Sequence, residues 1–496
     1  MRWIASLLLL AIAAPARGAG PEPELVSAVK AGKVATVRSL VERKADVNAT
    51  EADGTSALHW AVRASDVANT QLLIGAGARV DAVNRYGVTP LSLAARNGRG
   101  DLIDLLLKSR ASVKTAEATL PEGQTLVMLA ARTGSVDAVK RLVAAGSDVN
   151  ARETRTGTTA TVWAAASNRA EVIRALAESG ADLNVQSKVT NYPHTQNGVL
   201  LSGVEEGVSY VGQTVLPRGG WSAAMYAARE GASDAIRALA EAGANLDSTD
   251  PEGTSALIIA IINGHWATAA ALIEKGADLN LADIKGMTPL YAATDMHTLG
   301  DTFGRPYPPA PVIEGSVGLI KMLLAKGANP NARLKGTILK RVYDAGDNRL
   351  GEGATAFLRA ARKCDVTVMK LLLDAGADPK LSQKSGNTAL MLAAGAVSAG
   401  GDETQRISEE QALAAIKIGI AAGLDVNETN ATGDTVMHTA ATTSGGLRSV
   451  IRLLAESGAR LDIKNKADRT PLEAAERARQ PNEATIALLR EFSTGR

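Results

Sequence analysis

The chain has 496 residues, and its 54 Lys and Arg side chains nearly balance 52 Asp and Glu, for a formal charge of +2. A nearly neutral chain lacks the basic field that nucleic-acid binding requires, so nucleic acid is excluded as a partner. Only 3% of the residues are aromatic, while 47 are glycine. This composition predicts many closely packed small side chains rather than one core built on large anchors.

Residues 1–19 are expected to form a signal peptide. Met1 and Arg2 give a basic start, an apolar run follows over 3–14, and Ala14-Pro15-Ala16 has the small-x-small pattern of a cleavage site. The run is shorter than the roughly twenty apolar residues that a membrane-spanning helix needs. We therefore expect an exported mature chain, periplasmic or secreted, with no stable membrane insertion. An uncleaved anchor is the alternative.

A sequence unit recurs along the rest of the chain. Its opening half, Gly-x-Thr-Pro-Leu-x-x-Ala-Ala, is best preserved at Gly87–Ala95, and the step from Gly54 to Gly87 is 33 residues. Such a period predicts a solenoid, in which each unit packs only on its neighbours. The opening glycines are Gly54, Gly87, Gly123, Gly157, Gly220, Gly253, Gly286, Gly353, Gly386 and Gly433.

The unit carries its own helix signals. Thr89-Pro90 places a hydroxyl at the helix N-cap and a proline at the first helical position, as do 288–289 and 470–471. Gly98 suits the turn between two helices, and Gly146 suits a left-handed residue after the second helix. Asp148 then suits a tight turn closed by its side chain. Each repeat is predicted to be helix, turn, helix and hairpin loop.

These motifs resemble the ankyrin repeat over nearly everything after the first two dozen residues. The resemblance implies an all-α solenoid, an ankyrin-repeat stack of about twelve helix-turn-helix units with hairpin loops. It also implies a scaffold that binds a protein partner, whose identity the fold does not give. Polar capping repeats at both ends predict a monomer. The expected domains are repeats 1–5 over 20–184 with an N-terminal cap from 25, an inserted finger loop over 185–219, and repeats 6–12 over 220–496 with a C-terminal cap.

Three further insertions interrupt the second block, at 295–313, 333–350 and 395–409. Loops inserted into a regular scaffold often carry function. Tyrosine favours recognition because it offers a large area with a polar tip, so the tyrosines of the insertions are candidate partner contacts. The alternative is that they only pack the loops onto the scaffold. These residues are Tyr192, Tyr210, Tyr307 and Tyr343.

A basic row is the second candidate surface. One helix position directly after the paired alanines, which in the family faces the concave groove, is occupied by Arg63, Arg96, Arg132 and Arg229. These arginines are predicted to be partner-binding and to suit carboxylates. The alternative is that arginine is simply a good helix former, with Glu230 neutralising its neighbour. Later repeats place Ala166, Ile262, Asp295 and Arg362 at the same position.

A column of larger side chains stands directly before the alanines and is predicted to be an interior stripe between repeats. An aromatic recognition face is the alternative. The column reads Trp60, Leu93, Leu129, Trp163, Tyr226 and Ile259.

Catalytic chemistry is not expected. His59 and His438 occupy a position at which the family uses histidine to brace neighbouring turns, and the single cysteine, Cys364, replaces a turn glycine and is expected to be a small, partly buried residue. No phosphate-binding glycine loop or nucleophile elbow is present. Asp295 and His297, with Asp301, leave open a metal-dependent hydrolase in the insertions. We expect no enzyme activity, no metal and no cofactor.

Overall fold

The computed structural model describes residues 22–191, 195–196, 199–200, 217–298, 310–338, 350–397, 407–444 and 446–494. The chain divides into two compact units, residues 1–188 and 189–496, and each is described by itself. The predicted signal peptide, 1–19, lies outside the described residues.

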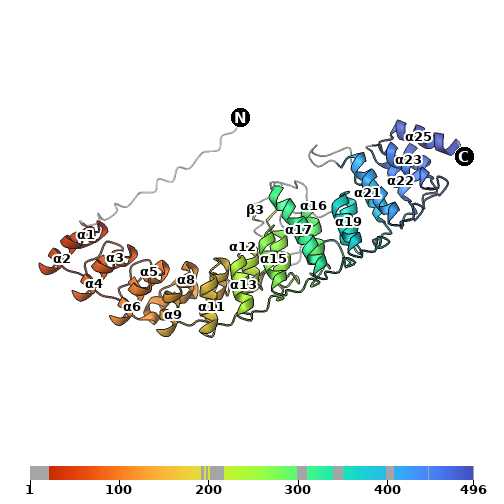
Figure 1. Cartoon of the computed structure of the whole chain (residues 1–496). Helices are drawn as coiled ribbons and strands as arrows, with labels where there is room; N and C mark the ends of the chain where they lie inside the picture. The colour runs from red at the N-terminus through yellow and green to blue at the C-terminus, as the bar shows by residue number, and fades with distance from the viewer. Residues whose placement is uncertain are drawn as a thin grey trace, which may run out of the picture. The chain divides into compact units, whose positions relative to one another are not determined.

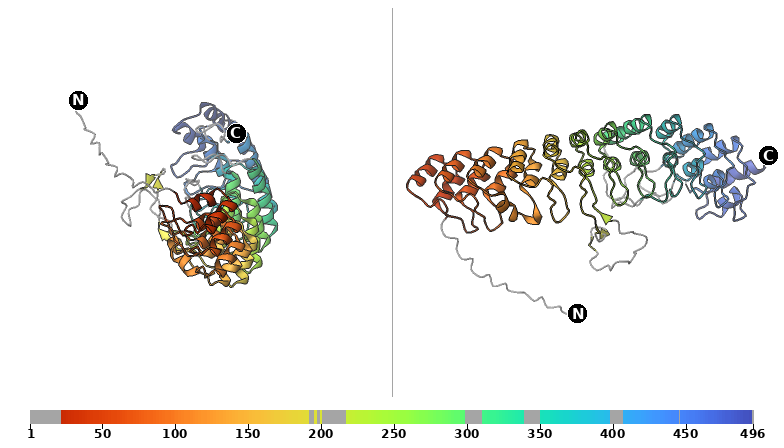
Figure 2. Two further views of the ribbon diagram at one scale, coloured as in Figure 1. Left: turned by 90° about the vertical axis from the view of Figure 1, so that its left-hand side faces the viewer. Right: turned by 90° about the horizontal axis from the view of Figure 1, so that it is seen from below.

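The first unit is a stack of short helix pairs. Figure 1 shows α3, α5 and α8 in one row and α4, α6 and α9 in a second row beside it. We call these the inner and outer helices, and the hairpin loops project from one side of the rows (Figure 2, right). The helices are α1 (Glu24–Lys30), α2 (Val34–Glu42), α3 (Ala57–Arg63), α4 (Val67–Gly75), α5 (Pro90–Asn97), α6 (Gly100–Lys108), α7 (Val113–Ala118), α8 (Leu126–Thr133), α9 (Val136–Ala144), α10 (Ala160–Ala166) and α11 (Ala170–Glu178), with a short 3-10 helix η1 (Pro121–Gly123).

The second unit continues the same pattern. Its helices are α12 (Ala223–Glu230), α13 (Ser233–Glu241), α14 (Ala256–Ile262), α15 (Trp266–Glu274), α16 (Pro289–Thr298), α17 (Ala310–Ala325), α18 (Ala356–Arg362), α19 (Val366–Asp374), α20 (Ala389–Ala394), α21 (Glu409–Ala421), α22 (Val436–Thr442), α23 (Arg448–Glu456), α24 (Pro471–Glu476) and α25 (Glu483–Thr494). Four two-residue strands, β1 (Thr190–Asn191), β2 (Thr195–Gln196), β3 (Val199–Leu200) and β4 (Pro217–Arg218), belong to the first insertion. The all-α repeat solenoid predicted from the sequence is confirmed.

The predicted capping chemistry is confirmed at the helix ends. The Thr89 hydroxyl accepts from the amide of Ser92 at 3.1 Å, and Pro90 begins the helix. The hydroxyls of Thr288 and Thr470 accept in the same way from Tyr291 and Glu473, both at 3.3 Å. These bonds satisfy amides that would otherwise have no partner in the first turn. Glycines with positive φ follow the helices, as at Gly98 (66°) between α5 and α6 and at Gly146 (94°) after α9.

The core runs along each unit as a continuous apolar layer. Within one repeat, Leu91, Ala94 and Ala95 are fully buried on α5, and α5 packs against both α3 and α8. The alanines let the inner helices approach closely, while leucines of the outer helices, such as Leu106 on α6, fill the space between the rows. Few large side chains are needed for this arrangement, as the composition predicted.

Asparagine side chains join one hairpin loop to the next. Asn48 donates from Nδ2 to the carbonyl of Gly77 at 3.2 Å and accepts from the amide of Arg79 at 2.8 Å. The predicted tight turn is also present, since the Asp148 carboxylate accepts from the amide of Asn150 at 2.9 Å. The contact to the following repeat was not predicted. The asparagines that make it are Asn48, Asn150, Asn280, Asn331 and Asn427.

Two segments depart from the predicted pattern. Helix α7, capped by the Ser112 hydroxyl, occupies the place of the hairpin loop after α6 and was not foreseen. The insertion predicted over 295–313 contains the last turn of α16 and the beginning of α17, so its two described ends are helical. Helix α17 is 16 residues long, whereas most outer helices have nine.

Candidate interaction surface on the inner helices

The predicted arginine row is exposed. Arg63, Arg96, Arg132 and Arg229 lie in the last turns of α3, α5, α8 and α12, and each is exposed. The position follows from the helix period, because the paired alanines before each arginine face the core. The first three belong to the first unit and Arg229 to the second.

Aromatic rings support several of these guanidinium groups. The Cζ of Arg63 lies 4.9 Å from the centroid of the Trp60 ring, and the Nζ of Lys30 lies 4.4 Å from the same centroid. Trp60 is itself held by its Nε1, which donates to the Glu51 carboxylate at 2.6 Å. A cation over an indole face is attracted by the ring quadrupole. The ring therefore fixes two cations at the exposed edge of α3.

The same combination recurs further along. In the first unit, the guanidinium of Arg132 lies 5.5 Å from the ring of Trp163 on α10, one repeat ahead. In the second unit, Arg229 lies 5.4 Å from the ring of Trp221 and 5.2 Å from that of Tyr226. Arg229 also contacts Glu230 at 2.6 Å, so the neutralisation considered from the sequence is present.

The column before the alanines is not an interior stripe throughout. Leu129 and Ile259 are buried, but Trp60, Trp163 and Tyr226 are only half-buried. Part of each ring is accessible and meets an arginine. Leu93 is half-buried as well. The prediction of an interior stripe is confirmed for Leu129 and Ile259 and is wrong for the other four members, of which the aromatic ones belong to the candidate surface.

Asp295 is the exception in the predicted row. Its side chain is buried between α16 and α18, where Oδ1 lies 2.5 Å from Nε of Arg359. The neighbouring His297 makes two contacts, from Nδ1 to the Ser316 hydroxyl at 2.7 Å and from Nε2 to the Asp365 carboxylate at 3.0 Å. Because Asp295 points into the scaffold, it does not contribute to the exposed row.

The hydrolase alternative depended on Asp295, His297 and Asp301, and Asp301 lies outside the described residues. Both ring nitrogens of His297 are already engaged by Ser316 and Asp365. Among the residues that the structure describes, no three His, Cys, Asp or Glu side chains are grouped so as to hold a metal ion. No observation in the described part of the chain favours the hydrolase.

The four candidate tyrosines, Tyr192, Tyr210, Tyr307 and Tyr343, lie outside the described residues. The base of the first insertion is described: β1 pairs with β4 antiparallel, with Thr190 opposite Arg218. The insertion therefore leaves and rejoins the scaffold through a two-stranded ribbon, as a finger-like extension of a hairpin loop requires.

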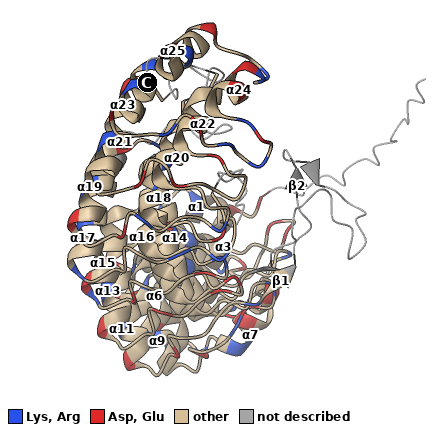
Figure 3. Ribbon diagram, turned by 90° about the vertical axis from the view of Figure 1, so that its right-hand side faces the viewer, with Lys and Arg blue, Asp and Glu red and all other residues tan. Residues whose placement is uncertain are grey.

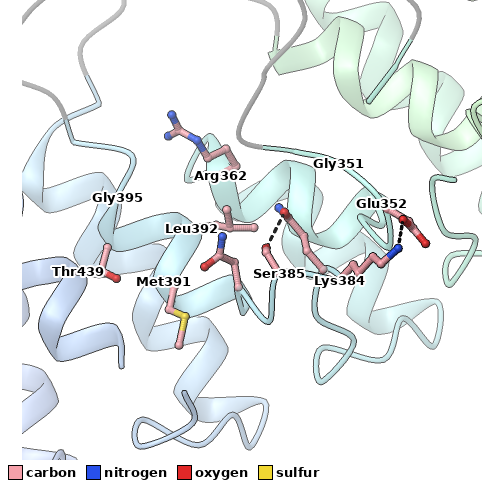
Figure 4. A pocket seen from close by; sticks show the side chains of 11 residues that line it. Gly351, Glu352, Arg362, Lys384, Ser385, Met391, Leu392, Gly395 and Thr439 are labelled. Atoms are coloured by element: carbon pink, nitrogen blue, oxygen red, sulfur yellow. Dashed lines mark hydrogen bonds and ion pairs between the residues drawn. The ribbon is translucent and has the colours of Figure 1, made fainter. Parts of the chain in front are cut away.

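A cavity of about 460 Å³ extends the candidate surface over α18, α20 and α22. Figure 4 shows Leu392 between Arg362 and Met391, with the pair Lys384 and Glu352 on the far side from Thr439. The Nζ of Lys384 lies 2.7 Å from the Glu352 carboxylate. The apolar side chains of Met391 and Leu392 line this cavity together with polar and charged side chains, a combination found at protein interfaces.

Cys364 is a structural residue, as expected. It is buried, has φ of 54° in place of a turn glycine, and its Sγ contacts the carbonyl of Ala393 at 3.7 Å. Burial raises the pKa of the Cys364 thiol to about 12. A thiol with so high a pKa is protonated at neutral pH and is a poor nucleophile.

Charges of the two signs are mixed on several outer helices of the second unit (Figure 3). Figure 3 shows Lys and Arg interspersed with Asp and Glu along α13, α15 and α17. Within the described ranges, none of the helices has the length and apolar character that crossing a membrane requires.

Comparison with known proteins gives a family and short local relatives. A family model described as ankyrin repeats (3 copies) matches residues 25–117, 111–187, 207–283 and 224–300, together just over half of the chain. The chain is 36% identical over 78 residues to the Nuclear factor NF-kappa-B p105 subunit of Mus musculus and 35% identical over 78 residues to that of Gallus gallus. Either match covers 16% of this chain and only 8% of the relative.

Among solved structures, the human ASB11 ankyrin repeat domain is 22% identical, with a TM-score of 0.40 over 51% of this chain and 98% of that domain. Ankyrin repeats generally serve as protein-interaction scaffolds, and the family is typically non-enzymatic. The family match and the repeated helix pairs together show that this chain belongs to the ankyrin-repeat family.

Proposed function

We propose that this protein is an exported, non-enzymatic scaffold that binds a protein partner through its inner helices and inserted loops. The observation that carries the proposal is the set of exposed arginines held over aromatic rings, Arg63 on Trp60 and Arg132 on Trp163 in the first unit. The signal-peptide pattern of residues 1–19 supports export, to the periplasm or outside the cell. The scaffold works as a monomer and needs no cofactor.

The ring contacts suit these arginines to recognition. A guanidinium resting on an aromatic face keeps its N–H edge free for a carboxylate, which it meets with two parallel hydrogen bonds. Because the ring already restricts the side chain, less conformational entropy is lost when a partner binds. Tryptophan, tyrosine and arginine are also the residues that most often dominate interface energetics. The preferred partner segment is therefore acidic and accessible from the side of the inner helices.

The test is a crosslinked pull-down from the exported fraction of the source organism. The baits are the mature chain, a variant carrying Arg63→Glu, Arg96→Glu and Arg132→Glu, and a matched control. The control carries Arg38→Glu, Arg43→Glu and Arg79→Glu, which change the same charge at exposed positions in the same unit but off the inner helices. Circular dichroism confirms that all three baits are folded.

A partner recovered with the mature chain and the control, but lost with the inner-helix variant, supports the proposal. Equal loss with both variants would show that only net charge matters. Full recovery with the inner-helix variant would remove the arginine row from the binding surface.

Export has a separate test. N-terminal sequencing of the protein from the periplasmic fraction should begin near residues 17–20, after the predicted cleavage site. Protein found only in the cytoplasm with Met1 intact would contradict export without touching the binding proposal.

A further inference from the structure

The last repeats contain a second cavity, of about 370 Å³, between inner helices α22 and α24. Three arginines line it, Arg469 before α24 and Arg477 and Arg479 after it. On the α22 side the lining includes Thr439 and Thr442, with Asp434 as the only carboxylate among the lining residues.

The arginines are not neutralised by that carboxylate. Asp434 Oδ1 accepts from the side-chain Nδ2 of Asn465 and Oδ2 from the Thr432 hydroxyl, both at 2.7 Å. Arg477 and Arg479 are exposed, and neither forms an ion pair within the described residues. The cavity therefore presents more guanidinium than carboxylate charge to a ligand.

Arg469 adds a more specific signal. Its Nε is buried and has no hydrogen-bond partner among the described residues. Its backbone is fixed, because the carbonyl accepts from Nε2 of His438 at 3.0 Å and the amide donates to Asn465 Oδ1 at 3.2 Å. A buried donor without an acceptor costs free energy. Arg469 as a whole is half-buried and lines the cavity, so its charge adds to that of Arg477 and Arg479.

The cavity adjoins the one over α18, α20 and α22, because Thr439 lines both. Thr439 and Leu392 stand at the repeat position directly before the paired alanines of α22 and α20, on the same face of neighbouring inner helices. The two cavities are therefore neighbours on one row of inner helices, with the arginines lining one and Leu392 and Met391 lining the other.

We propose that the cavity lined by the three arginines binds carboxylate side chains of an acidic, extended segment of a protein partner. The guanidinium groups of Arg477 and Arg479 would each pair with a carboxylate, and the positive charge of Arg469 would attract the same acceptors. Two neighbouring cavities on one row of inner helices suit an extended peptide better than a small free anion. This inference rests on the proposed function only in taking the ligand to be part of a protein.

The experiment uses the full mature chain and a fluorescein-labelled hexaglutamate peptide, with binding followed by fluorescence anisotropy. The first variant, Arg477→Ala with Arg479→Ala, removes exposed side chains and should not affect folding. The second, Arg469→Gln, tests the contribution of the positive charge on Arg469. The matched control is Arg448→Ala with Arg452→Ala, which removes two exposed arginines from outer helix α23 of the same unit.

Hexaglutamate should bind the mature chain, and the double variant at 477 and 479 should weaken binding at least about tenfold, as expected from losing two charge-assisted hydrogen-bonded contacts. The control should change binding by less than about twofold, because Arg448 and Arg452 do not line the cavity and solvent screens exposed charges. Equal weakening by the control, or equal competition by unlabelled hexaglutamine, would overturn the proposal.

A phosphate ion is the competing ligand for a cluster of arginines. Displacement of hexaglutamate by inorganic phosphate at an equal concentration would overturn the peptide assignment in favour of a phosphate site. If the pull-down recovers a partner through Arg63, Arg96 and Arg132 but hexaglutamate does not bind, this inference fails and the proposed function stands.

Discussion

The Nε of Arg359 lies 2.5 Å from Oδ1 of Asp295, and the two side chains are only 4% and 11% exposed. The pair joins α16 to α18, the inner helices of neighbouring repeats. A second contact, from His297 at the end of α16 to Asp365 at the beginning of α19, lies beside it. The extended helix α16 is therefore tied to the following repeat by an ion pair and a histidine–carboxylate contact in addition to apolar packing.

Removing one partner of this buried pair should destabilise the second unit. Asp295→Ala leaves the Arg359 guanidinium buried without its carboxylate, which typically costs about 3–5 kcal/mol. Because stability in a solenoid is local, hydrogen exchange of α16 and α18 is the appropriate measurement. Both helices should lose protection, while α3 and α5 should not change.

The matched control is the exposed pair of Arg460 and Asp462, whose side chains are 60% and 72% exposed. Asp462→Ala should change stability by less than about 1 kcal/mol, because solvent screens such a pair. If Asp295→Ala lowered stability as little as Asp462→Ala does, the buried pair would contribute no more to stability than an exposed pair.

Arg110 offers a test of backbone strain. It adopts φ of 69° at the position after the second helix, where most other repeats have glycine. Arg110→Gly should therefore stabilise the third repeat by about 1 kcal/mol, since a left-handed residue with a Cβ costs roughly 1–2 kcal/mol. Urea unfolding of the first unit, followed by circular dichroism, checks the change.

The reverse substitution is the control. Gly146 has φ of 94° and an added Cβ would meet no atom within 4 Å, so Gly146→Ala isolates the backbone effect. Gly146→Ala should lower the free energy of unfolding by about the amount by which Arg110→Gly raises it. If the free energy of unfolding changed in the same direction in both variants, backbone strain at Arg110 would be contradicted.

Local chemistry makes the repeat predictable from sequence. The Thr89 cap and the Gly98 turn depend only on residues within a few positions, so a short stretch of sequence is enough to indicate them. Ion pairs between repeats are not predictable in this way. Asp295 and Arg359 are 64 residues apart, and nothing in the local pattern distinguishes a buried aspartate from an exposed one at that position.

In the candidate surface, too, some features could be predicted from the sequence and others could not. The exposure of Arg63 and Arg132 followed from the helix period, but the half-buried state of Trp60 and Trp163 depends on how closely the next helix can pack. The cavity of Arg469 was missed because it is built by α22 and α24 together. A cluster of three arginines around the last Thr-Pro-Leu motif was the signal that could have indicated it.

The Cys364 thiol should be inert in the folded protein. Burial raises its pKa to about 12, so the nucleophilic thiolate is scarce at pH 8. A disulfide-exchange reagent such as Ellman's reagent should react slowly with the native chain and rapidly after urea unfolding. Fast reaction of the native chain, at the rate of the unfolded one, would show that the α18–α19 turn opens readily.

Stability of the first unit should fall as the pH is lowered. Burial holds the pKa of His59 below its ordinary value, although its hydrogen bond to the Val88 carbonyl acts in the opposite direction. Because the unfolded chain takes up the proton first, stability is lost as the pH falls below about 6.5 and towards the lower pKa of the folded state.

The variant His59→Gln removes that titration. It should be less stable than the parent at pH 7.5, because the contacts with Ser56 and Val88 are altered, but the difference between the two should narrow at pH 5.5. Urea unfolding at both pH values measures this. If the difference in stability between the parent and the variant were the same at pH 7.5 and pH 5.5, His59 would not contribute to the pH dependence.

The first insertion should be dispensable for folding but needed for full partner binding. Ser187 is buried and the Lys188 amide donates to the Thr156 carbonyl at 2.7 Å, so a deletion should begin beyond these residues. Removing 192–216 keeps the pairing partners Thr190 and Arg218 and takes away Tyr192 and Tyr210. A short glycine linker can close the ribbon at little entropic cost.

The chain without 192–216 should unfold like the parent and recover less partner in the pull-down. Removing 399–405 from the last insertion is the control and should leave recovery unchanged. If the first deletion unfolds the protein, the tyrosines pack the loop onto the scaffold instead of meeting a partner.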